Sequence, residues 1–189
     1  TLIAVAKTRT PNDIEEAIRS GIQVIGENRV QEAEMKNRAV SLPVNWHLVG
    51  HLQTNKVKKA VEIFDLIHSL DSLSLAKEID RRADLAGKVV KVLVQVNTSG
   101  ETSKFGVAPE NVLDLIGSIS GFKSVRIVGL MTIGAIGTVG DAARPFFVRL
   151  RESRDRVVAA GIPQVSMKHL SMGMTGDFET AIEEGATLV

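Results

Sequence analysis

One lysine stands where the chain could carry out covalent chemistry. Lys7 follows the apolar run of residues 2–6 and precedes a polar turn at residues 8–11. The run predicts a parallel strand that is buried on both faces, and parallel sheets place their chemistry at the carboxyl ends of their strands. A lysine held there loses hydration, which makes its amine a better nucleophile toward an aldehyde. The alternative is a lysine that simply extends into water from the strand end.

A second candidate site is the loop Ser171-Met-Gly-Met-Thr-Gly-Asp177, which joins an apolar run to a helical stretch. Ser171 and Thr175 offer hydroxyl donors, and the first N–H groups of the following helix lack partners inside the helix. Gly173 and Gly176 allow a ligand to approach the backbone closely. Barrels commonly bind phosphate in the loops after their seventh and eighth strands. The loop therefore predicts a phosphate site, with an ordinary serine- or threonine-capped helix as the alternative.

Two histidines, His47 and His51, are four residues apart but do not predict a metal site. No third ligand lies nearby in the sequence, and no helical His-Glu-x-x-His pattern is present. We interpret both as hydrogen-bonded histidines of a pocket or a core. Lys104 follows the fifth expected strand and so lies near the same edge of the sheet, although a surface role is the simpler interpretation.

The elements that must position these residues alternate along the chain between short apolar runs and amphipathic stretches. The apolar runs predict strands near residues 1–8, 24–28, 46–50, 66–71, 89–97, 125–132, 169–173 and 186–189. Between them we expect helices, one of which begins with Thr10 as N-cap and Pro11 at its first position. Asp71 is expected to cap the helix that buries Leu75, Ile79 and Ala83, and Gly161 to end the helix that buries Phe147, Leu150 and Val157.

Eight alternating strands and helices in fewer than 200 residues favour a closed (β/α)8 barrel that forms a single domain over residues 1–189. A doubly wound open sheet is the alternative, but no glycine-rich turn follows the first strand. The chain begins and ends inside expected strands, so both ends look trimmed. The carboxyl ends of barrel strands share one rim, which would carry Lys7, Asn28, His51, Asp71, Asn97, Thr132 and Ser171. Such a mixed, weakly charged rim indicates a small-molecule site.

Composition excludes several classes of protein. Apolar residues make up 44% of the chain, so a substantial core can form. The net charge of +1 gives no electrostatic basis for binding nucleic acid or an anionic membrane. The chain lacks cysteine, as is usual in a reducing cytoplasm, and contains neither a membrane-spanning run nor a signal peptide. We therefore expect a cytoplasmic protein.

Several motifs, taken together and in order, resemble the YggS/PROSC family of pyridoxal 5′-phosphate (PLP) homeostasis proteins. They are Ala4-Val-Ala-Lys-Thr8, Gly26-Glu-Asn-Arg-Val-Gln-Glu32, Trp46-His-Leu-Val-Gly-His-Leu-Gln-Thr-Asn-Lys56, Val94-Gln-Val-Asn-Thr-Ser-Gly-Glu-Thr-Ser-Lys104, Gly129-Leu-Met-Thr-Ile-Gly134 and Leu170-Ser-Met-Gly-Met-Thr-Gly-Asp-Phe-Glu179. The resemblance implies a TIM barrel of the alanine-racemase N-terminal-domain type, with PLP held on Lys7 as a Schiff base.

The same resemblance implies that Asn28 and Met131 line the cofactor and that Ser171, Gly173 and Thr175 hold its phosphate. The family also has an additional first helix and an Arg-Ile-Gly segment on strand eight, and this sequence contains neither. That arginine is expected beside the pyridine ring, so we expect the pocket of this chain to be incomplete.

We interpret the chain as a protein that carries and buffers PLP, with no catalytic residue and no metal. Two-base racemases of this barrel type use a tyrosine opposite the lysine, the related decarboxylases use a cysteine, and this chain contains neither residue. The partners expected are PLP itself and PLP-dependent apoenzymes, with the protein acting as a monomer. The alternatives are a PLP-dependent racemase or lyase that uses Lys7 with His51 as base, and a Schiff-base aldolase that works without PLP.

Overall fold

The computed structural model describes residues 1–135 and 137–189. Within these residues, the strands form one parallel sheet in the order β1 to β7, and helices follow the strands in the expected alternation. The strands are β1 (Ala4–Val5), β2 (Val24–Glu27), β3 (Asn45–Leu48), β4 (Leu66–Leu70), β5 (Val90–Gln95), β6 (Val125–Met131) and β7 (His169–Ser171). The helices are α1 (Pro11–Arg19), α2 (Val30–Ala39), α3 (Val57–Ile63), α4 (Leu73–Leu85), α5 (Val112–Ile119), α6 (Arg144–Ala160) and α7 (Phe178–Glu183), with 3-10 turns η1 (Thr54–Lys56), η2 (Pro109–Asn111) and η3 (Gly140–Ala143).

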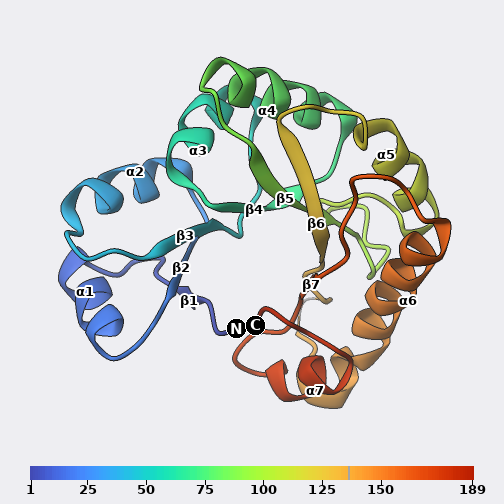
Figure 1. The fold of residues 1–189 in the computed structure, drawn as a ribbon. Coiled ribbons are helices and arrows are strands. Elements are labelled where there is room, and N and C mark those ends of the chain that lie inside the picture. The colour runs from blue at the N-terminus through green and yellow to red at the C-terminus, as the bar shows by residue number, and fades with distance from the viewer. Residues whose placement is uncertain (136) are drawn as a thin grey trace.

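The sheet curls so that the helices lie around its outside and the two chain ends lie side by side (Figure 1). Residues 187–189 lie between β7 and the start of the chain. On one side, the Leu188 N–H donates to the Leu170 carbonyl (3.1 Å). On the other, the Ile3 N–H donates to the Val189 carbonyl (2.7 Å). The α/β barrel-type fold is thus confirmed, with seven strands in the described residues and only an isolated Ser171–Leu188 bridge at the eighth position.

Two groups of apolar side chains stabilise this arrangement from opposite faces of the sheet. Alternate strand residues point outward and pack beneath the helices, as Ile67, Leu130 and Leu170 do. The residues between them point into the curl, where they form a second buried cluster of Ile3, Val24, Leu66, Leu93, Met131 and Leu188. The interior of the curl is therefore packed with side chains, and any ligand must bind at its end.

The helix ends match most of the predicted capping residues. Thr10 and Asp13 form a reciprocal capping box at the start of α1, and Gly161 ends α6 with φ of 58°. The prediction that Asp71 caps α4 is wrong. The N-cap is Ser72, whose extended backbone lets its hydroxyl accept from the Leu75 N–H (3.4 Å). No helix in the described part of the chain is both long and apolar enough to cross a bilayer.

The prediction that the first strand is buried on both faces is also wrong. Leu2 is 60% exposed and Val5 is 45% exposed, although Ile3 and Ala6 are buried. β1 has only two residues in regular pairing with β2. Val5 points into the curl on the same face as Ile3, but it lies two residues closer to the mouth of the curl and is less covered there.

Candidate functional site

Lys7 occupies a tight turn at the carboxyl end of β1. The Arg9 N–H donates to the Ala6 carbonyl (3.0 Å), which places Lys7 and Thr8 at the two central positions of the turn. Thr8 has a φ of 64°, a conformation that costs a non-glycine residue roughly 1–3 kcal/mol. Lys7 itself is exposed, so the prediction that its amine loses hydration is wrong for this structure. The turn holds the backbone of this lysine while leaving its amine accessible.

A buried ion pair contacts the first residue of this turn. The Lys36 ammonium, on α2, donates to the Ala6 carbonyl (2.7 Å) and to Glu27 Oε1 (2.7 Å). Glu27 ends β2 and is fully buried, and among the described residues its other oxygen, Oε2, has no hydrogen-bond partner. Burial raises the pKa of Glu27, although the Lys36 hydrogen bond and charge oppose that shift. Lys36 thus ties α2 and β2 to the residue immediately before Lys7.

The loop after β7 has the donor set of an anion site. Among the described residues, the backbone N–H groups of Gly173, Thr175 and Gly176 donate to no protein acceptor. Asp177 shapes the loop, because its carboxylate accepts from the Met174 N–H (2.6 Å). Free N–H groups together with the hydroxyls of Ser171 and Thr175 suit a phosphate group. The residues present therefore fit the phosphate that the sequence led us to expect.

The glycines of this loop have a second reason to be glycine. Gly173 has a φ of 92°, and a Cβ there would lie 2.6 Å from the Cβ of Ala181 on α7. A Cβ at Gly176 would lie 3.1 Å from a methyl carbon of Val139. The sequence predicted close approach of a ligand at both positions, whereas the structure shows close approach of other protein segments. The absence of a side chain at both positions therefore lets the loop lie close to α7 and to the start of η3.

Ser171 begins a chain of hydrogen bonds that runs into the curl of the sheet. Its hydroxyl lies 3.0 Å from Nδ1 of His68, and Nε2 of His68 lies 3.0 Å from Nδ1 of His47. Burial lowers the pKa of His68 well below its ordinary value, and it lowers the pKa of His47 to about 4. Both imidazoles are therefore neutral at neutral pH.

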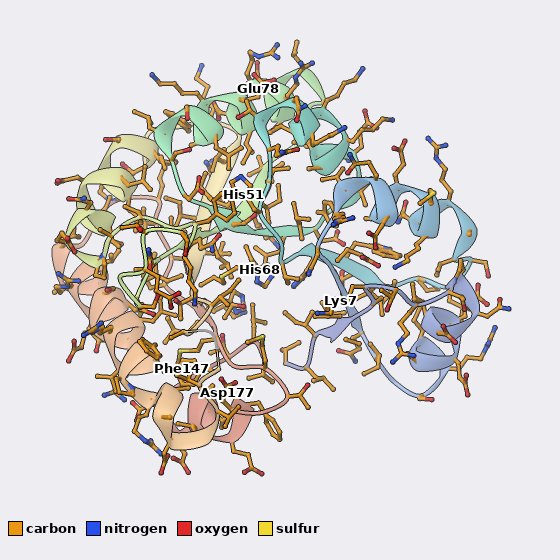
Figure 2. The ribbon with its side chains drawn as sticks, turned by 180° about the vertical axis from the view of Figure 1, so that it is seen from behind. Lys7, His51, His68, Glu78, Phe147 and Asp177 are labelled. Atoms are coloured by element: carbon orange, nitrogen blue, oxygen red, sulfur yellow. The ribbon has the colours of Figure 1, made fainter. Side chains whose placement is uncertain are left out.

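Sequence reasoning missed His68, and it was only partly right about the other histidines. His47 is a buried, hydrogen-bonded histidine as predicted, whereas His51 is exposed and stacks on Phe105 with ring centroids 3.6 Å apart. The alternation of Leu66-Ile-His-Ser-Leu70 could have placed His68 on the inner face with Leu66. Figure 2 shows His68 near the centre of the molecule, with Lys7 beside the first strand.

The remaining predicted cofactor residues fall into two groups. Met131 pairs in register with Ser171, but it is only 3% exposed and belongs to the interior cluster. Asn28 is exposed and follows β2, the neighbour of β1, at the same end of the sheet as Lys7. The backbone of Asn28 also abuts Gly50, where a Cβ would lie 2.2 Å from the Asn28 carbonyl oxygen. The structure thus brings Lys7 and Asn28 to adjacent strand ends, and Met131 and Ser171 to another adjacent pair.

Other rim residues serve the protein itself. The Thr132 hydroxyl donates to the Val96 carbonyl (2.8 Å), and the Asn97 amide donates to the Glu101 carbonyl (2.9 Å). Lys104 donates to the Gly134 carbonyl (2.5 Å) and pairs with Glu101 (3.2 Å). Its ammonium is therefore held by the surrounding loops and is not free at the surface.

Comparison with known proteins gives a consistent result. Residues 1–189 match the family described as alanine racemase, N-terminal domain. The chain is 46% identical over 189 residues to the pyridoxal phosphate homeostasis protein of Aquifex aeolicus, covering all of this chain and 82% of that protein.

Solved structures show the same relationship. PipY of Synechococcus elongatus with PLP bound is similar with a TM-score of 0.91 and 37% identity, over all of this chain and 88% of that one. The structure of PipY without PLP gives a TM-score of 0.93 and 39% identity, with the same coverage. Alanine racemase from Clostridium difficile shares the fold, with a TM-score of 0.72 at 16% identity over 90% of this chain and 46% of that one.

Proposed function

Because the chain belongs to the pyridoxal phosphate homeostasis protein family, we propose that residues 1–189 form one domain that binds PLP at Lys7 and holds it for release to other proteins. PLP supplies an aldehyde that condenses with a lysine amine and releases water. PipY, at 37% identity, has been solved with PLP bound, which supports the same ligand here. The accessible amine of Lys7 is the group we propose as the nucleophile.

The observation that carries this proposal is the short span between the two halves of the site. The phosphate-suited loop follows β7, Lys7 follows β1, and only residues 187–189 lie between them in the sheet. Two strand spacings amount to roughly 10 Å, which a small phosphorylated aldehyde and a lysine side chain can bridge together. We propose that Ser171, Gly173 and Thr175 hold the phosphate and that Asn28 and Met131 border the ring.

We propose that the protein holds PLP without sustained catalysis. Turnover of an amino acid requires a base positioned within hydrogen-bond reach of the substrate α-proton. The chain contains neither tyrosine nor cysteine. His51, the base considered in the enzymatic alternative, is exposed to water, stacks on Phe105, and has its Nδ1 3.6 Å from Asp71. An exposed lysine at an open strand end favours exchange of PLP with solvent and with apoenzymes, which we propose as partners of a cytoplasmic monomer.

The experiment that tests the carrier function compares turnover with transfer. PLP-loaded protein should racemise or decarboxylate common amino acids no faster than free PLP, and it should restore activity to a PLP-free transaminase. The assay should measure chiral amino acids and CO2 release in parallel with transaminase activation. Sustained turnover that disappears in Lys7→Ala would overturn the carrier function in favour of a PLP enzyme.

The phosphate loop leads to a separate prediction about vitamer selectivity. A hydrogen bond to a charged group contributes roughly 1.5–3 kcal/mol, so Ser171→Ala should weaken PLP binding by about one to two decades. Pyridoxal, which lacks the phosphate, should bind almost unchanged. Equilibrium dialysis with both vitamers measures the two effects, with Ser166→Ala as a control on an exposed serine before β7. An equal loss for PLP and pyridoxal would show that Ser171 does not bind phosphate.

A further inference from the structure

The hydrogen-bond chain behind Ser171 offers two arrangements of its protons, and only one suits an anion. Each neutral imidazole carries a proton on one ring nitrogen. In the first arrangement, His47 Nδ1–H donates to His68 Nε2, and His68 Nδ1–H donates to the Ser171 oxygen. In the second, His68 Nε2–H donates to His47 Nδ1, and the Ser171 hydroxyl donates to His68 Nδ1. Both arrangements satisfy the same two contacts of 3.0 Å.

The two arrangements differ in what the Ser171 hydroxyl offers to a ligand, which is either its proton or only its lone pairs. When His68 donates to Ser171, the hydroxyl proton is free to point out of the curl toward the loop at residues 171–177. When Ser171 donates to His68, the hydroxyl presents only lone pairs, which repel a phosphate dianion. Donation into the Ser171 oxygen also polarises its O–H bond and makes it a stronger donor.

We propose that His68 and His47 are positioning residues that set the direction of the Ser171 hydroxyl, and that phosphate binding selects the arrangement in which His68 donates to Ser171. The inference rests on the proposed function, since it takes Ser171 as a phosphate donor. His68 is 0% exposed and His47 is 8% exposed, so solvent does not compete for either ring. The other titratable groups whose charge acts on the pair are His169, which acts on both rings, and Asp65, which acts on His47.

The direct test is to locate the ring protons of the four histidines by ¹H–¹⁵N correlation spectroscopy in protein labelled with ¹⁵N-histidine. With PLP or with inorganic phosphate bound, His68 and His47 should both carry their proton on Nδ1. Pyridoxal should not enforce this arrangement. A His68 proton on Nε2 in the phosphate-bound protein would overturn the inference, as would two protons on either ring at pH 8.

Two variants test the consequence for binding. His68→Leu removes the donor and should weaken PLP binding by about tenfold while leaving pyridoxal binding unchanged. The amide nitrogen of His68→Asn can take the place of Nδ1 as the donor, so this variant should bind PLP within about threefold of the wild-type affinity. In a Ser171→Ala background, His68→Leu should cause no further loss of PLP binding, because His68 acts on the phosphate only through the Ser171 hydroxyl. If Ser171→Ala weakens PLP and His68→Leu does not, this inference fails and the proposed function stands. If the wild-type protein binds neither PLP nor inorganic phosphate, both fail.

Discussion

Replacement of Lys7 by alanine should abolish covalent attachment of PLP. In the wild-type protein, borohydride reduction should fix the cofactor on the peptide that contains Lys7, and the intact mass should show a single adduct. The turn between Ala6 and Arg9 holds this lysine at the strand end with its amine exposed. Alanine has no amine, so Lys7→Ala should retain only the affinity that the phosphate loop provides and should show no adduct after reduction.

The matched control is Lys58→Ala, which removes another exposed lysine, on α3. It should leave the adduct on Lys7 unchanged in mass and amount. Peptide mapping after reduction distinguishes the two sites. An adduct of undiminished amount in Lys7→Ala, mapped to Lys104 or Lys56, would contradict the assignment of Lys7. The result does not depend on enzymatic activity, so it tests the binding site independently of the carrier function.

Most of the scaffold could be predicted because it depends on local patterns. The inner face of α4 carries apolar residues at helical spacing, and all three predicted ones are buried as expected: Leu75, Ile79 and Ala83. Gly161 ends α6 because it takes up a positive φ at low cost. The alternation of such helices with apolar runs was enough to predict a parallel α/β fold, since neighbouring parallel strands need a long crossover connection and a helix supplies it.

The chemistry around the site was less predictable because it joins residues that are distant in the sequence. His68 and Ser171 are 103 residues apart, and Lys36 is 30 residues from the Ala6 carbonyl that it contacts. The sequence shows that Lys36 lies on a helix, but the contact depends on how α2 packs across β1 and β2. The exposure of Val5 likewise depends on its position near the mouth of the curl, which apolar patterning does not describe.

The largest effect on stability is expected for Lys36→Met. This change removes the ammonium that satisfies the Ala6 carbonyl and one oxygen of Glu27, a fully buried carboxylate. Breaking a buried ion pair from one side typically costs about 3–5 kcal/mol. Urea unfolding at pH 8 should therefore show a loss of this size in the free energy of unfolding. The single tryptophan, Trp46, is 4% exposed and provides the fluorescence signal.

The pH dependence of this loss identifies its cause. The pKa of Glu27 is raised in the folded protein, so folding favours its protonated form. Protonated Glu27 therefore contributes stability that is fully present below the ordinary pKa of a glutamate, and this contribution is lost as the pH rises through the raised pKa of the folded protein. Lys36 opposes the shift, so its removal should raise the pKa of Glu27 further. The difference in stability between Lys36→Met and the wild type should therefore shrink as the pH is lowered from 8 to 5.

Two further variants separate the buried charge from the loss of a lysine side chain. The double variant Glu27→Gln, Lys36→Met removes the unpaired charge and should recover most of the stability at pH 8. Its difference in stability from the wild type should change little between pH 5 and 8. Lys59→Met breaks ion pairs with Glu34 and Glu62 that are partly exposed to solvent, and it should cost far less stability than Lys36→Met. A loss in Lys36→Met no larger than that of Lys59→Met would mean that the turn at Lys7 does not depend on the buried pair. Because Lys36 contacts the carbonyl of Ala6, a large loss should instead be accompanied by slower formation of the PLP adduct on Lys7 under conditions where the variant remains folded.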